Sequence, residues 1–216
     1  MAKFPIYLEL KNRRVVLIGG GNVAFDKAKS LLEAEARLVV VAKDIGKPLK
    51  ALCLRNGVEI IQAPYAKEYI GPAVMLVAAT NDRQLNEQIY RDCQEREILC
   101  NVVDVPDLCD FFTAAVVKRG NLQIAIGTDG YSPAYSSHLR KKLEQLFTVT
   151  HGQFLEHLHW ARQKTFTRFQ DFDTRKVISD QLVNDDSFHY FVEQGPDLWR
   201  DYAEDIINQT VSTDRG

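Results

Sequence analysis

The sequence predicts an α/β protein that begins with a doubly wound parallel sheet, continues into a small α+β region and ends in a helical segment. Three observations support this prediction. Between residues 15 and 103, short β-branched runs alternate with helical patterns. The runs lack polar alternation, which is typical of strands covered on both faces. Beyond them, two further strands follow each other across a short turn, which favours antiparallel pairing.

The strands of the parallel sheet are expected at five apolar runs. These are VVLIG (15–19), RLVVVA (37–42), VEII (58–61), AVMLVAAT (73–80) and ILCNVV (98–103). Between the first two runs, Ala24, Ala28 and Leu31 repeat at the spacing of one helical face, and a similar repeat separates the last two runs. We therefore expect crossover helices between parallel strands.

The second half of the chain has a different pattern. FFTAAVV (111–117) and LQIAIG (122–127) are predicted to be strands joined by a turn. A helix is expected after Pro133, because proline favours a first turn and the leucines beyond it repeat at helical spacing. From about residue 148 the chain is aromatic and polar without β-branched runs, which indicates helices. The predicted divisions of the chain are 1–110, 111–147 and 148–216.

The composition excludes several classes of function. The chain has 216 residues with 27 basic and 29 acidic side chains, so its net charge of −2 offers no general attraction for nucleic acid or an anionic membrane. No stretch approaches the roughly 18 apolar residues of a membrane span, and we expect a soluble, cytoplasmic protein. The four cysteines are spaced too widely for a CxxC pair, so neither a metal site nor a disulfide is predicted.

The stretch GGGNVA (19–24) fits the pattern GxGxxA, with Gly19 and Gly21 at the glycine positions and Ala24 at the third. In this pattern the first glycine permits a tight turn, the second lets a diphosphate approach the backbone, and the small third residue lets the helix pack on the strand. The loop follows a predicted strand and opens a predicted helix, which favours a dinucleotide site over an ordinary tight turn. A Rossmann-like domain is therefore predicted.

Polar residues that follow predicted strands are further candidates for cofactor binding. Lys43 and Asp44 follow the second run; Asp44 suits the ribose hydroxyls of NAD, whereas Lys43 suits the 2′-phosphate of NADP. Thr80 and Asn81 end the fourth run, at the carboxyl edge where open α/β sheets bind ligands. Solvated loop charges and ordinary loop starts are the alternative interpretations.

Asp104 directly follows the NVV that ends the fifth run, which places it at the same edge of the sheet. There its carboxylate can accept a proton while a hydride leaves the substrate for a nicotinamide. A turn or a helix cap is the alternative role for an aspartate in this position. The position alone leaves both interpretations open.

Four stretches together resemble a known family. They are PIYLELKNRRVVLIGGGNVAFDKAKSLLEAEARLVVVA, LVAATND, CNVVDVPDLCDFF and TDGYSPAYSSHLRKKLE. In this order and spacing, over roughly residues 4–147, they resemble the precorrin-2 dehydrogenase and sirohydrochlorin ferrochelatase domain of siroheme synthases. The combination is more specific than the glycine pattern alone.

The resemblance implies an NAD-dependent oxidoreductase of siroheme biosynthesis that converts precorrin-2 to sirohydrochlorin, and in some members the same cleft also inserts Fe²⁺ as a ferrochelatase, a lyase. It implies a homodimer, with 111–147 as the dimerisation region and 148–216 as the helical domain that closes the tetrapyrrole cleft. The family's catalytic aspartate falls on Asp104. Its cofactor contacts fall on Gly19, Gly21, Asn22, Val23, Lys43, Asp44, Thr80 and Asn81.

The carboxylates of a tetrapyrrole need cationic or N–H partners when they leave water. The basic residues nearest to the expected cleft are Lys118, Arg119, Arg140, Lys141 and Lys142. The histidines of the aromatic segment are expected to pack or to face solvent, because His157 and His159 are two apart and point to different faces of a helix.

Two other functional classes compete with this interpretation. A non-catalytic NAD-sensing module explains the glycine loop but gives Asp104 no role. A short-chain dehydrogenase needs a Tyr-x-x-x-Lys pair after the nucleotide-binding half. The only such pair, Tyr7 with Lys11, precedes the glycine loop, so its position excludes this class.

Overall fold

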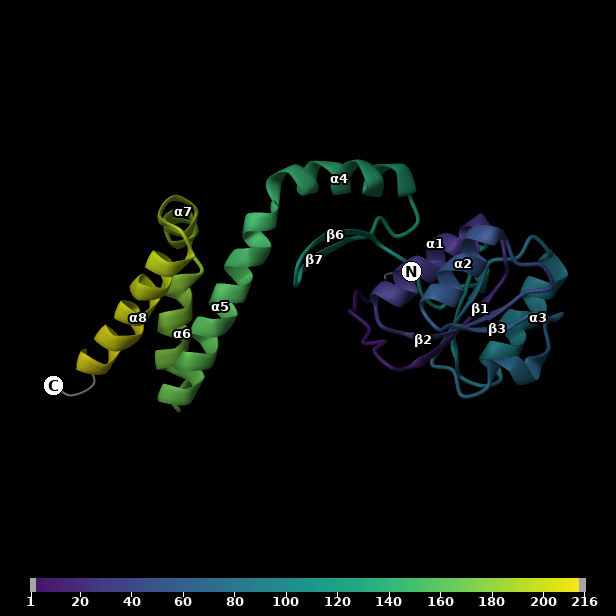
Figure 1. The fold of residues 1–216 in the computed structure, drawn as a ribbon, viewed down its shortest axis with the longest axis horizontal. Helices are drawn as coiled ribbons and strands as arrows, with labels where there is room; N and C mark the ends of the chain where they lie inside the picture. Colours follow the sequence, from purple (N-terminus) through teal and green to yellow (C-terminus); the bar gives the residue numbers. More distant parts are fainter. Residues whose placement is uncertain (1–2, 214–216) are drawn as a thin grey trace. The chain divides into compact units, whose positions relative to one another are not determined.

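The structure, a computed structural model, describes residues 3–213 and consists of two compact units, residues 1–113 and 114–216. The first unit holds a parallel sheet, and the second holds a hairpin and the later helices (Figure 1). The outermost residues of the predicted terminal divisions, 1–2 and 214–216, lie outside the described residues.

The first unit is built on a parallel five-stranded sheet in the order β3-β2-β1-β4-β5. Its strands are β1 (Arg14–Ile18), β2 (Arg37–Val41), β3 (Glu59–Ile61), β4 (Met75–Ala78) and β5 (Leu99–Val102). Each strand overlaps one of the five apolar runs, so the predicted doubly wound, Rossmann-like α/β fold is confirmed.

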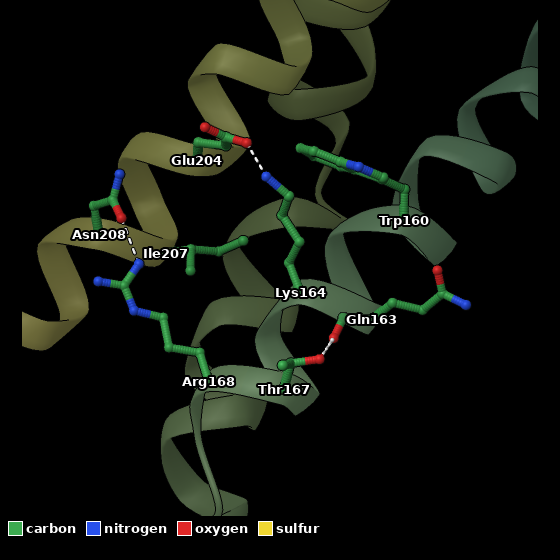
Figure 2. A pocket seen from close by; sticks show the side chains of 8 residues that line it. All are labelled: Trp160, Gln163, Lys164, Thr167, Arg168, Glu204, Ile207 and Asn208. Carbon is green, nitrogen blue, oxygen red and sulfur yellow. Dashed lines mark hydrogen bonds and ion pairs between the residues drawn. The ribbon is translucent and has the colours of Figure 1, made fainter.

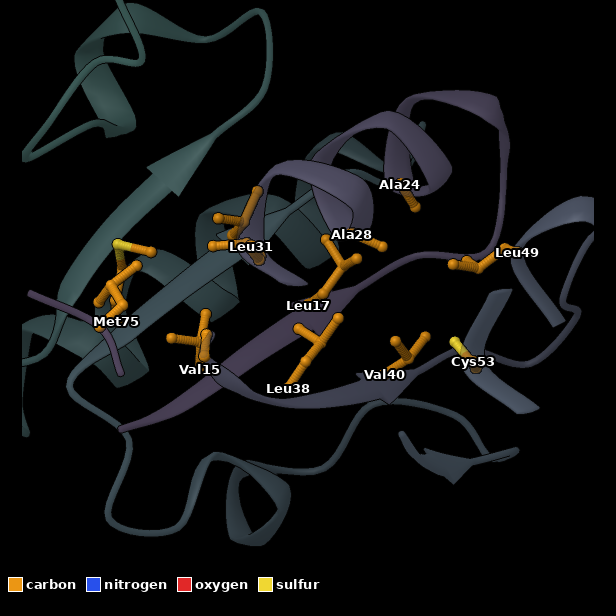
Figure 3. Packing of buried hydrophobic residues seen from close by; sticks show 13 residues of the cluster. Val15, Leu17, Ala24, Ala28, Leu31, Leu38, Val40, Leu49, Cys53 and Met75 are labelled. Carbon is orange, nitrogen blue, oxygen red and sulfur yellow. The ribbon is translucent and has the colours of Figure 1, made fainter. Parts of the chain in front are cut away.

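Helices cover both faces of this sheet. The helices α1 (Asn22–Glu33) and α2 (Lys47–Arg55) pack on the face that carries Val15 and Leu17 of β1 (Figure 3). The helix α3 (Arg83–Gln94) packs on the opposite face, which carries Val16 and Ile18. Because successive side chains of a strand point to opposite faces, burial on both faces requires the unbroken apolar run seen in β1.

The strand order reverses between β1 and β4, whose carboxyl ends are neighbours. Backbone hydrogen bonds extend past the strands here: the Ala79 N–H donates to Ile18 O at 2.7 Å, and the Val103 N–H donates to Ala78 O at 2.9 Å. The residues that follow β1, β4 and β5 are therefore held at one edge. Open α/β sheets bind ligands at such a reversal.

The hairpin of the second unit differs from its predicted boundaries. Its strands are β6 (Ala115–Arg119) and β7 (Leu122–Ile126), so the strand expected at 111–117 begins four residues later. The segment before it is held at the edge of β5, because the Asp110 N–H donates to Cys100 O and the Asn101 side chain donates to Phe111 O, both at 2.8 Å. These long-range bonds keep residues 111–114 out of the hairpin.

The remainder of the second unit is helical, as predicted. Its helices are α4 (Pro133–Leu146), α5 (Val149–Arg168), α6 (Phe172–Leu182), α7 (Asp185–Gln194) and α8 (Pro196–Thr213). Trp199 of α8 is fully buried in the core that α5, α6, α7 and α8 share, and its indole N–H donates to Ser187 Oγ of α7 at 2.9 Å. Among the described residues, none of the helices has the length and apolar character to cross a bilayer.

Candidate active site

The loop after β1 begins with a glycine that no other residue can replace without strain. Gly19 has φ +129°, and a Cβ at this position would lie 2.3 Å from the carbonyl oxygen of Ala79. Its N–H donates to Val41 O at 2.9 Å. The turn is thus fixed between the ends of β2 and β4, as expected for the first glycine of the motif.

Gly20 is a structural residue of the loop that the sequence motif did not single out. A Cβ at this position would lie 1.9 Å from the carbonyl oxygen of Asp44, and the Gly46 N–H donates to Gly20 O at 2.9 Å. The segment that carries Lys43 and Asp44 is therefore packed directly against the glycine loop. The one signal in the sequence was the run of three glycines where the motif needs two.

Gly21 is the glycine of the loop that has open space beside its Cα. It is the N-cap of α1, its φ of −87° suits any residue, and nothing lies within 4 Å of a Cβ built there. No side chain caps the helix, and helix geometry leaves the N–H groups of Asn22 and Val23 without intrahelical acceptors. An open backbone cradle with unsatisfied N–H donors fits the diphosphate of a dinucleotide.

Thr80 and Asn81 follow β4 beside this loop. The Thr80 hydroxyl donates to Asn86 Oδ1 at 2.7 Å, and the Asn86 side-chain amide donates back to Thr80 O at 3.1 Å. The side chain of Thr80 is thus used to hold the start of α3, whereas that of Asn81 is exposed. At this position the backbone and Asn81 are the groups that a ligand can reach.

Asp104 lies two residues after β5, at the same edge, and its side chain is exposed. Its φ of +62° places it in the left-handed region, which aspartate and asparagine tolerate better than most residues. The turn around it is closed by the Val105 N–H, which donates to Val102 O at 3.2 Å. The Cys109 thiol also donates to Val102 O at 3.2 Å, so two hydrogen bonds to the same carbonyl oxygen stabilise the turn that carries Asp104.

Lys27 of α1 belongs to the same neighbourhood and was missed by the sequence analysis. Its ammonium donates to Thr113 Oγ1 at 2.9 Å. Partial burial lowers the pKa of Lys27, and electrostatic interactions with Asp104 and Cys109 oppose this shift. On a predicted surface helix a lysine looks like an ordinary solvated charge, so no sequence signal distinguished it.

The structure thus brings all the predicted cofactor and catalytic residues to one carboxyl edge within the first unit. The glycine loop, the segment after β2, the start of the β4–α3 loop and Asp104 come from four different strand ends. Such an edge can hold a dinucleotide and place one carboxylate beside it.

The basic residues expected to serve a substrate lie in the second unit, and two of them have structural roles there. The Arg119 guanidinium donates to the carbonyl oxygens of Phe147 and Glu144, at 2.8 and 2.9 Å, near the end of α4. Arg140 forms an ion pair with the Glu144 carboxylate. The side chains of Lys118, Lys141 and Lys142 are exposed.

Two histidines of the second unit have local structural partners. The Thr148 N–H donates to His151 Nδ1 at 3.1 Å, and the Arg200 side chain donates to His157 Nδ1 at 3.1 Å. Burial, with Arg200 nearby, lowers the pKa of His157. The described residues contain no group of three or more His, Cys, Asp or Glu side chains arranged to hold a metal ion.

An open groove lies between α5 and α8 in the second unit (Figure 2). Lys164 pairs with Glu204 across it, and the Arg168 guanidinium donates to Asn208 Oδ1. The Lys164 ammonium lies over the ring of Trp160, 4.6 Å from the ring centroid. Because both cations already have partners, the groove is a weaker candidate for an anionic ligand than the sheet edge.

Known proteins are similar to this chain in sequence, one of them over nearly its whole length. Residues 6–115 match a family model described as "Putative NAD(P)-binding", and residues 119–146 match one described as "Sirohaem biosynthesis protein central". The siroheme synthase of Thioalkalivibrio sulfidiphilus is 30% identical over 97% of this chain and 43% of its own length. That of Psychrobacter arcticus is 38% identical over 71% of this chain and 28% of its own length.

A solved structure, that of "SirC, precorrin-2 dehydrogenase", aligns with 97% of this chain and 100% of its own at a TM-score of 0.76 and 20% identity. At this identity the likeness establishes a shared fold. The chain spans less than half the length of the two siroheme synthases. Because the first family model covers 6–115, just over half of the 216 residues, the chain belongs to the NAD(P)-binding family of that model.

Proposed function

We propose that this protein oxidises precorrin-2 to sirohydrochlorin with NAD⁺ as the hydride acceptor. The observation that carries the proposal is the carboxyl edge of the sheet, which carries both an open glycine cradle, after β1, and an exposed aspartate, after β5. The siroheme synthase relatives and the fold shared with a precorrin-2 dehydrogenase support the choice of substrate.

The proposed roles follow from where the residues lie. The N–H groups at the start of α1 bind the diphosphate, with Gly21 leaving room for it. The Asp44 carboxylate accepts hydrogen bonds from the ribose hydroxyls, which favours NAD over NADP. The bound cofactor supplies a hydride acceptor. Asp104 takes the proton that leaves the substrate with the hydride, so that two hydrogens are removed in all.

The test of Asp104 is the variant Asp104→Asn. Asparagine suits the φ of +62° as well as aspartate does. Alanine would add backbone strain, so that a loss of turnover could come from strain as well as from the missing carboxylate. We expect turnover of precorrin-2 to fall by about 10²-fold or more, because a general base is removed, with the Kd for NAD⁺ unchanged. Asp107→Asn, an exposed carboxylate three residues further on, is the matched control. Equal turnover by both variants would remove Asp104 from the mechanism.

We also propose that the protein acts as a homodimer through its hairpin and α4. A two-stranded sheet is marginal on its own, and β6 and β7 form such a sheet. The large apolar side chains exposed on these elements are Val116, Tyr135 and Leu146, with Tyr131 just before α4 and Val149 at the start of α5. A second copy of the chain would cover them.

Leu146→Asp tests the dimer, because Leu146 is 65% exposed at the end of α4. Light scattering should show a dimer for the native protein and a monomer for this variant. Leu54→Asp, at a leucine 70% exposed in the first unit, is the control and should stay dimeric. A native protein that is monomeric at micromolar concentration would refute this part of the proposal.

Insertion of Fe²⁺ into sirohydrochlorin is the further reaction that the sequence resemblance implies, with iron as a substrate. The pyrrole N–H protons must leave as the metal enters, and Asp104 is the base at hand. The visible spectrum of sirohydrochlorin with Fe²⁺ and the protein, against a protein-free control, tests this step. An NAD-sensing module, the competing class, would bind NAD⁺ and catalyse neither reaction.

A further inference from the structure

Lys27 is a half-buried cation at the edge of the candidate site. It lies in α1, two turns after the glycine loop, and its ammonium donates to Thr113 Oγ1 at 2.9 Å. A lysine ammonium has three N–H donors, so the neutral hydroxyl of Thr113 accounts for one of them. Two donors remain for other acceptors.

The charges around Lys27 do not neutralise it within the chain. Asp104 and Cys109 interact with it electrostatically, and Asp110 in turn interacts electrostatically with Cys109. Yet among the described residues no carboxylate lies within ion-pair distance of the Lys27 ammonium. Partial burial without an anionic partner is unfavourable for a cation, which indicates that the partner comes from a ligand.

We propose that Lys27 binds a carboxylate of the substrate beside Asp104. This proposal rests on the proposed function, because that function supplies a polycarboxylate substrate at this edge. An ion pair at Lys27 would hold the substrate by one side group while Asp104 faces the carbon–hydrogen and nitrogen–hydrogen bonds to be broken. Lys27 would then set both the affinity and the orientation of the substrate.

The competing role for Lys27 is a tether that holds Thr113, the last residue of the first unit, against α1. Thr113 is exposed, so water can replace the Lys27 ammonium as the hydrogen-bond partner of its hydroxyl. A tether would affect folding without a selective effect on the substrate. The two roles therefore differ in what a substitution changes.

The experiment compares Lys27→Met and Lys27→Gln with Lys27→Arg, and uses Lys29→Met as the matched control. Lys29 lies on the same helix, is exposed and pairs with Asp26. KM and kcat for precorrin-2, the Kd for NAD⁺ and the Kd for sirohydrochlorin, followed by fluorescence, are measured for each. If the methionine variant does not fold, the glutamine variant carries the test, since it retains a donor for Thr113.

We expect removal of the charge to raise KM for precorrin-2 and Kd for sirohydrochlorin by about tenfold or more, because a charge-assisted contact is lost. The Kd for NAD⁺ should not change, and Lys27→Arg should retain substrate affinity. Affinity for sirohydrochlorin should fall as pH rises through the lowered pKa of Lys27, and Lys27→Arg should move that loss to higher pH. A loss caused by Cys109, whose pKa burial raises, would persist in the arginine variant.

An active native protein with KM and sirohydrochlorin affinity unchanged in both uncharged variants would overturn the assignment of Lys27 and leave the proposed function intact. A native protein that neither oxidises precorrin-2 nor binds sirohydrochlorin would overturn both. A rise in KM confined to the uncharged Lys27 variants, absent from Lys29→Met, would support the proposal.

Discussion

The variant Gly21→Ala separates the binding role of the glycine loop from its structural role. A Cβ at Gly21 meets nothing within 4 Å, and the backbone there suits alanine. Replacing glycine by alanine makes the unfolded chain less flexible, and this stabilises the folded protein by about 0.4–1 kcal/mol. Alanine is a poorer N-cap than glycine, by about 0.5–1 kcal/mol. The two effects offset each other, so the free energy of unfolding should change by no more than about 0.5 kcal/mol.

NAD⁺ binding should respond very differently to this variant. The added methyl enters the space proposed for the diphosphate, and overpacking a fitted contact costs about 1–3 kcal/mol, or about 5- to 150-fold in Kd. Urea unfolding and calorimetric titration with NAD⁺ measure the two quantities. Gly19→Ala is the contrast, because its Cβ would lie 2.3 Å from Ala79 O at φ +129° and should destabilise the fold itself. Native NAD⁺ affinity in a folded Gly21→Ala protein would refute the cradle.

Three further predictions concern cofactor choice and stability. Asp44→Asn should raise the Kd for NAD⁺ by about tenfold and narrow the preference for NAD⁺ over NADP⁺, because a charged acceptor for the ribose hydroxyls is lost. Competition titrations with the two cofactors measure this preference, which would stay constant if Asp44 is only a loop charge. Tyr65→Phe should lower the free energy of unfolding, measured in urea, by about 1.5–3 kcal/mol, because the Tyr65 hydroxyl donates to the buried Asp92 carboxylate at 2.8 Å. An unchanged free energy of unfolding would mean that this hydrogen bond is not formed in solution. Hydrogen bonds from Thr174 lower the pKa of Asp171 at the N-cap of α6. The stability that they confer is therefore present at neutral pH, and it is lost as the pH falls below about 4 toward the pKa of Asp171 in the folded protein. Thermal melts against pH should show this loss, and Asp171→Asn should lack it.

The parallel sheet and the site's location were predictable from local patterns. Apolar runs without polar alternation identify strands buried on both faces, and a parallel sheet brings all their carboxyl ends to one edge. Residues that follow different runs, such as Asn81 and Asp104, are therefore expected to lie at the same edge on sequence grounds alone. The strand order itself, which puts the glycine loop at its reversal, comes from the structure.

The features that were not predicted depend on contacts between distant residues. Residues 111–114 have strand propensity, but the Asn101 side chain and the backbone of Cys100 hold the preceding chain at the edge of β5. Gly20 is required by the approach of Asp44, twenty-four residues later in the chain. Lys27 is hydrogen-bonded to Thr113, 86 residues later in the chain, and no local pattern encodes that pairing.

A crystal structure of the protein with NAD⁺ bound tests the central claim most directly. The account predicts the diphosphate on the N–H groups at the start of α1, beside Gly21, with the nicotinamide ring at the edge of the sheet next to the Asp104 carboxylate. A diphosphate bound elsewhere, or a nicotinamide ring on the side of the sheet away from Asp104, would contradict it.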